Sequence, residues 1–153
     1  MNRYQLPYYW LAVGAGLWLA GCAGPPADSV AAPKPAPSTD VGRLQAWQDA
    51  ERVAGNETGR QTVIGSGDSM RPIYGDQTVL VLAPIEYAKL KVGMQVGYVN
   101  RIGRRVVHVL LAPGLDGWRV QGLNNEDEDG ERVTRYNLIG VVYASFATDS
   151  ELK

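Results

Sequence analysis

Short apolar runs separated by turn residues fill the carboxy-terminal part of the chain. The run at 78–83 (TVLVLA) is almost wholly apolar, which predicts a strand buried on both faces. The whole pattern predicts strands at residues 61–64, 78–83, 95–99, 105–112, 118–121 and 138–146. Several short strands with frequent turns favour a mainly β fold, a compact and curled antiparallel sheet.

A helix is predicted before the first strand, over residues 41–54, with Asp40 as its N-cap and Gly55 at its end. One side of this helix carries Leu44, Trp47 and Glu51, with Ala50 and Val53 beside them. The apolar stripe is thin, so we expect the helix to pack on the edge of the domain.

The amino-terminal residues have the pattern of an export signal. Arg3 is the only charge before an apolar run, from Tyr8 to Ala20, that is short for a transmembrane helix. The run ends in Leu-Ala-Gly-Cys at 19–22, which resembles the bacterial lipobox. The resemblance implies that residues 1–21 are removed and that Cys22 is acylated, which anchors the chain to a membrane. An ordinary signal peptide, or a single-span anchor with an incidental cysteine, is the alternative.

The predicted domain boundaries follow from composition. Residues 22–39 are rich in Pro, Ala and Ser and are expected to form a semi-extended tether. Residues 40–153 then form one folded domain. Ala23 and Gly24 follow Cys22, with no Asp at the second position, which permits the outer membrane of a two-membrane envelope by resemblance to lipoprotein sorting. We therefore expect a bacterial envelope protein that is lipid-anchored on the periplasmic face.

Charge and cysteine content exclude several classes of protein. The formal net charge of the 153-residue chain is −1 and no block of Lys or Arg occurs, so no nucleic-acid partner is indicated. One cysteine excludes an intramolecular disulfide, and one cysteine with one histidine argues against a structural zinc site. No metal and no cofactor are predicted.

The segment GSGDSMRP, at 65–72, is the main candidate for chemistry. Glycines before Ser69 permit a sharp turn that exposes its hydroxyl, and Met70 can fill the space beneath the turn. Read without context, the same residues describe an ordinary surface loop.

A serine nucleophile needs a base, and His108 is the only histidine. It lies in an apolar strand, where a histidine usually serves packing, but an imidazole accepts protons readily near neutral pH. Of the four lysines, Lys89 and Lys91 lie in a short connector, and an exposed lysine is a poor base because it stays protonated.

An ordered series of motifs resembles the boxes of type I signal peptidases and of the related SOS-repressor peptidases. The series comprises GDSMRP at 67–72, GDQTVLV at 75–81, LKVGMQVGY at 90–98, VVHV at 106–109, QGLNN at 121–125 and LIGVV at 138–142. It spans roughly residues 62–146. The histidine in the fourth box resembles the branch that uses a Ser-His pair instead of Ser-Lys.

The resemblance implies roles for particular residues. Ser69 would be the nucleophile and His108 the general base, with Asp129 orienting the imidazole. The family's acidic motif carries Asp where this chain has Leu123, whereas Glu128 and Asp129 match its later acidic pair. The alternative for this acidic loop is a solvated turn.

The oxyanion would lie at the turn formed by Ser66, Gly67 and Asp68, held by the Ser69 N–H and assisted by the Ser66 hydroxyl. The family often has a serine where this chain has Gly67. A protein or peptide substrate is expected to bind as an extended strand along residues 61–66 and about 78–84, with small side chains beside the cleaved bond.

These expectations combine into a membrane-tethered serine endopeptidase of the signal peptidase I type that processes an exported protein. The chain has no second apolar run that could span a membrane, which favours a specialised processing protease over a housekeeping signal peptidase. No recognisable DNA-binding segment or Ala-Gly cleavage segment precedes Ser69, which argues against a self-cleaving repressor. The alternative is an inactive lipoprotein that uses the same fold as a binding module, supported by Leu123. A purely structural lipoprotein would leave the ordered motifs unexplained.

Overall fold

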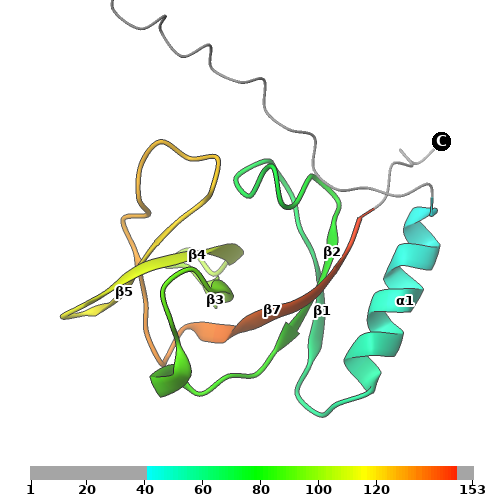
Figure 1. Cartoon of the computed structure of the whole chain (residues 1–153), viewed down its shortest axis with the longest axis horizontal. Coiled ribbons are helices and arrows are strands. Elements are labelled where there is room, and N and C mark those ends of the chain that lie inside the picture. The colour runs from blue at the N-terminus through cyan, green and yellow to red at the C-terminus, as the bar shows by residue number, and fades with distance from the viewer. Residues whose placement is uncertain (1–40, 148–153) are drawn as a thin grey trace, which may run out of the picture. The chain divides into compact units, whose positions relative to one another are not determined.

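The computed structural model describes residues 41–147 as a mainly β domain with one α-helix (Figure 1). Its strands form a single antiparallel sheet of seven, in the order β1-β2-β7-β3-β4-β5-β6. The elements are α1 (Arg43–Gly55), β1 (Gln61–Ile64), β2 (Val79–Ala83), the 3-10 helix η1 (Tyr87–Lys89), β3 (Gln95–Val99), β4 (Arg105–Gly114), β5 (Gly117–Gln121), β6 (Arg132–Val133) and β7 (Leu138–Phe146). The predicted fold class is therefore confirmed, and all six predicted strands are present. The short β6 is an addition that the sequence pattern did not indicate.

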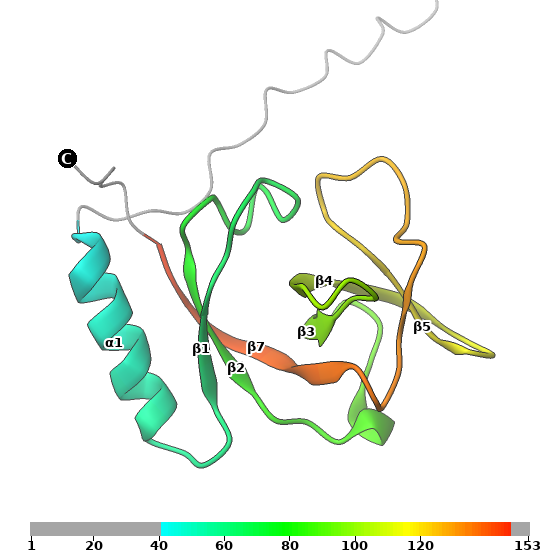
Figure 2. The ribbon, with the colours of Figure 1, turned by 180° about the vertical axis from the view of Figure 1, so that it is seen from behind.

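Helix α1 lies beside β1 and β2, far from β4 and β5, in both ribbon views (Figures 1 and 2). Its buried face is a stripe of alanines, Ala46, Ala50 and Ala54, that packs on apolar residues of β2 and β7. Alanines four residues apart allow the helix axis to approach the sheet closely.

Two details of the helix prediction were wrong. The N-cap is Gly42, which makes no side-chain capping bond, and Asp40 lies outside the described residues. Leu44 is 71% exposed, so it does not belong to the packed face, whereas Trp47 and Val53 flank that face as expected.

Strand β2 is buried on both faces, as its apolar run predicted. Val79 and Val81 pack against α1, because alternate side chains of a strand point the same way. Leu80 points to the opposite face, where it packs with Met70 and Tyr74. Met70 and Tyr74 belong to the segment that follows β1. This segment therefore packs on the face of β2 opposite to α1.

Strand β7 joins the two halves of the sheet. It pairs with β2 over residues 141–146 and with β3 over residues 138–141. Where the two pairings overlap, Gly97 lies opposite Gly140, and a Cβ on Gly140 would lie 2.3 Å from the Ala83 carbonyl oxygen. The absence of side chains at this crossing allows both halves of the sheet to share one strand.

Within residues 41–147, α1 is the only α-helix, and no helix there is long and apolar enough to cross a membrane. The predicted leader, tether and lipidated Cys22 lie outside the described residues.

We predict that Gly140→Ala lowers the free energy of unfolding by about 1–3 kcal/mol, because the new methyl group collides with backbone that cannot move aside. Urea denaturation followed by circular dichroism measures the change. Gly130→Ala is the matched control, since nothing lies within 4 Å of its added Cβ. Equal stability of the two variants would show that the crossing is not tightly packed.

Candidate active site

Ser69 lies on a tight turn that follows β1. Gly67 has a φ of 86°, a conformation that side chains disfavour, and its N–H donates to Asp76 Oδ1 at 2.9 Å. That bond, together with one from the Gln77 side chain, lowers the pKa of Asp76. After Ser69, the Arg71 N–H donates to the Asp68 carbonyl, which closes the turn. The predicted sharp turn at Gly67 is therefore present.

An apolar cluster supports this turn from below. Met70 and Tyr74 are buried with Leu80 of β2, and residues of β1, β4 and β7 surround them. The Tyr74 hydroxyl donates a short hydrogen bond to Gln95 Oε1 of β3. Met70 thus fills the space beneath Ser69, as the sequence suggested, and fixes the height of the turn above the sheet.

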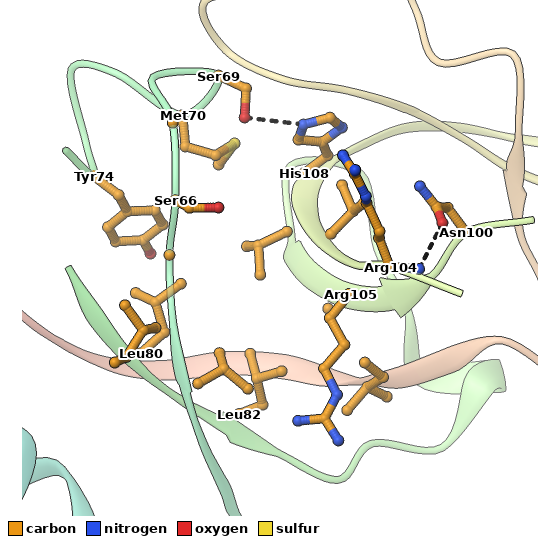
Figure 3. Close-up of a pocket in the computed structure, with 18 of the residues that line it drawn as sticks. Ser66, Ser69, Met70, Tyr74, Leu80, Leu82, Asn100, Arg104, Arg105 and His108 are labelled. Carbon is orange, nitrogen blue, oxygen red and sulfur yellow. Dashed lines mark hydrogen bonds between the residues drawn. The ribbon is translucent and has the colours of Figure 1, made fainter. Parts of the chain in front are cut away.

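The side chains of Ser69, His108 and Asp129 form a continuous hydrogen-bonded chain. His108 Nε2 lies 3.1 Å from Ser69 Oγ, and His108 Nδ1 lies 2.6 Å from Asp129 Oδ2 (Figure 3 shows the first contact). Because a carboxylate only accepts hydrogen bonds, this geometry assigns the proton of a neutral imidazole to Nδ1, and Nε2 then offers its lone pair to the serine hydroxyl. His108 is 7% exposed and is held in β4 opposite Val96.

Tyr98 is a fourth member of this chain that sequence analysis missed. Its hydroxyl donates a short hydrogen bond to the same Asp129 oxygen that His108 contacts. Its ring meets the His108 ring edge-on, with centroids 6.4 Å apart. The side chain is 1% exposed, and burial, followed by the Asp129 hydrogen bond, raises the pKa of Tyr98 well above its ordinary value of 10.0. Tyr98 therefore stays protonated and serves as a permanent donor to Asp129.

The acidic loop at residues 122–130 closes over the turn. The Asn124 N–H donates to the Ser69 carbonyl at 2.8 Å, and the Asp129 N–H donates to Val120 O of β5 at 2.9 Å. These backbone bonds bring Asp129 to His108, although 21 residues separate the two in sequence. The loop is therefore a structural part of the site and not only a solvated turn.

A pocket of about 360 Å³ opens beside Ser69 and His108 (Figure 3). Its volume lies within the range of ligand sites. Residues 63–67 line one wall and residues 104–108 line the facing wall. The Ser66 hydroxyl points into it in Figure 3.

Other predicted residues lie apart from the chemistry. Asp68 is exposed and pairs with Arg71, and Glu128 pairs with Arg119, which lowers the pKa of Glu128. Leu123 is 45% exposed. Lys89 and Lys91 are exposed and do not line the pocket. Residues 41–147 contain no cluster of three or more His, Cys, Asp or Glu side chains arranged to hold a metal ion.

Comparison of the chain with models of protein families, with curated proteins and with solved structures finds no match in any of the three. Function is therefore inferred from the geometry of the site.

The buried phenols predict a loss of stability at high pH. Burial raises the pKa of Tyr74 as well as that of Tyr98, so above about pH 10 the unfolded chain releases protons that the folded chain retains. The stabilisation is complete below pH 10 and declines as the pH rises further.

Denaturation midpoints measured between about pH 9 and 11 test this. Tyr98→Phe should reduce the slope, whereas Tyr136→Phe, which replaces a side chain that is 93% exposed, should leave it unchanged. An unchanged slope in Tyr98→Phe would contradict the buried, hydrogen-bonded environment of this phenol.

Proposed function

We propose that the chain is a membrane-tethered serine endopeptidase of the signal peptidase I type that cleaves a peptide bond in an exported protein. The observation that carries the proposal is the hydrogen-bonded chain from Ser69 through His108 to Asp129, with the serine hydroxyl at a pocket wall. A nucleophile, a base and a group that orients the base form the general arrangement for acyl transfer.

In the proposed reaction, Ser69 Oγ attacks the peptide carbonyl while His108 Nε2 accepts the hydroxyl proton. His108 then donates this proton to the leaving amine, and water repeats the sequence on the acyl-enzyme. Asp129 stabilises the imidazolium that forms between the two transfers. Tyr98 holds the Asp129 carboxylate in place and shares its charge, so it acts as a positioning residue.

The oxyanion that forms during attack needs donors close to Ser69. The Ser69 N–H donates to no acceptor within residues 41–147, so it is free to bind the developing charge. The Ser66 hydroxyl, which points into the pocket, is the proposed second donor.

A substrate strand fits between two strand edges. Within the described residues, β1 pairs only with β2, which leaves the outer edge of β1 open. The pairing of β4 with β5 begins at Val109, so residues 105–107 of β4 are open on the side that faces away from β3. The expectation that residues 78–84 bind the substrate main chain was wrong, because β2 is paired on both sides, with β1 and β7. An extended peptide would instead lie between β1 and the start of β4.

The Leu-Ala-Gly-Cys motif carries the proposed membrane location, with Cys22 as the acylated residue. A tethered peptidase of this kind would meet substrates at the periplasmic face of a bacterial membrane. We further propose that it serves a particular exported protein and does not act as a general signal peptidase.

We predict that a small serine-directed fluorophosphonate phosphonylates Ser69 of the full-length chain, purified in detergent, as the serine Oγ displaces fluoride from phosphorus. Labelling, measured by intact mass, should be absent in Ser69→Ala and should rise from about pH 5 to 9 as an imidazole loses its proton. His108→Ala should slow it by roughly 10²–10⁴-fold. Asp129→Asn should also slow it, because the amide no longer fixes the ring.

Ser66→Ala and Lys91→Ala serve as controls, the first for a partial loss and the second for no loss. Labelling that survives His108→Ala would show that another group is the base. Failure of the wild-type chain to label at any pH would favour the alternative, a binding module without catalysis.

A further inference from the structure

Two adjacent arginines, Arg104 and Arg105, line the pocket at the start of β4. Figure 3 shows the Arg104 side chain extending toward the His108 end of the pocket, whereas the Arg105 side chain extends toward Leu82. Arg104 directly precedes β4 and Arg105 is its first residue. The pair therefore places one guanidinium near each end of the pocket.

These two side chains differ from seven other arginines of the domain. Six arginines each lie within 4.0 Å of a carboxylate oxygen: Arg52 with Asp49, Arg60 with Glu57, Arg71 with Asp68, Arg101 with Glu131, Arg119 with Glu128 and Arg132 with Asp116. Arg135 lies over the ring of Tyr87. Within residues 41–147, the guanidinium groups of Arg104 and Arg105 have neither a carboxylate nor an aromatic partner.

The pocket itself contains no opposing charge. No Asp or Glu is among the residues that line it, so two positive charges face an otherwise neutral surface. The mouth also has apolar side chains, with Ile64 49% exposed on β1 and Ile102 73% exposed on the β3–β4 hairpin. Such a surface attracts carboxylates and also offers contact to an apolar peptide segment.

We propose that this pocket selects peptides with acidic side chains close to the cleaved bond, bound by Arg104 and Arg105. A guanidinium binds a carboxylate through two parallel hydrogen bonds, which gives direction as well as attraction. Because substrate would lie along the open edge of residues 105–107, its side chains pass these two groups. The biological purpose of this specificity rests on the proposed peptidase function, whereas peptide binding itself can be measured without catalysis.

Arginines at an open strand edge have a second use, which is to prevent edge-to-edge association. That use would make no distinction between an acidic peptide and its neutral counterpart. The comparison of glutamate with glutamine therefore separates the two explanations.

The test uses the full-length Ser69→Ala chain in detergent and fluorescein-labelled alanine-rich peptides, each with Glu or Gln at one scanned position. C-terminal amide and free-acid forms distinguish a side-chain carboxylate from a terminal one. Fluorescence anisotropy at low salt should show at least one Glu peptide binding about tenfold more tightly than its Gln twin. This preference should fall as salt is added.

Arg104→Gln and Arg105→Gln should each reduce the preference, and the double variant should abolish it. Arg101→Gln is the matched control, because Arg101 lies on the same hairpin, pairs with Glu131 and does not line this pocket. The proposal would be overturned if Glu and Gln peptides bound equally, or if neither bound. It would also be overturned if Arg101→Gln reduced the preference as much as the pocket variants do, or if the preference appeared only with free C-termini. Labelling of Ser69 by the small neutral probe is scored separately, so its failure would reject the peptidase and leave the carboxylate preference standing.

Discussion

The Asp129 carboxylate is the point at which the parts of this domain meet. One of its oxygens accepts hydrogen bonds from His108 of β4 and from Tyr98 of β3. Its own backbone is held by β5, and the loop that carries it is bound to the carbonyl of Ser69. A partly buried carboxylate is costly unless donors compensate for lost water, so these contacts depend on one another. Removing any one of them would loosen both the loop and the imidazole.

The sheet brings these distant segments together. β7 runs between β2 and β3 and thereby joins the half that carries Ser69 to the half that carries His108. The glycine pair at their crossing lets the two halves approach without side chains between them. The apolar cluster of Met70, Tyr74 and Leu80 then sets the distance between the serine turn and the histidine strand. Packing, rather than the turn alone, fixes the contact between Ser69 and His108.

Much of this could be predicted from sequence because the signals are local. Alternating apolar runs mark the strands, and the fully apolar run of β2 indicates burial on both faces. Composition and resemblance predicted Ser69, His108 and Asp129 as site residues. In the structure, His108 lies within hydrogen-bond distance of both Ser69 and Asp129.

What sequence could not supply depends on distant pairing. Tyr98 reads as an ordinary core residue of a strand, since nothing local indicates that its hydroxyl meets Asp129, 31 residues away. The position of β2 between β1 and β7 is equally hidden, which is why its main chain was wrongly expected to bind substrate. The helix was misjudged because three small alanines, not Leu44, make its contact with the sheet.

The single histidine permits a direct test of the hydrogen-bonded chain. Nitrogen-15 NMR of the His108 ring, at a pH of about 8 where an ordinary imidazole is neutral, reports which nitrogen carries the proton. We predict a proton on Nδ1, in a strongly deshielded hydrogen bond that disappears in Asp129→Asn, and an unprotonated Nε2 that faces Ser69. A proton on Nε2, or a spectrum that Asp129→Asn leaves unchanged, would contradict the account.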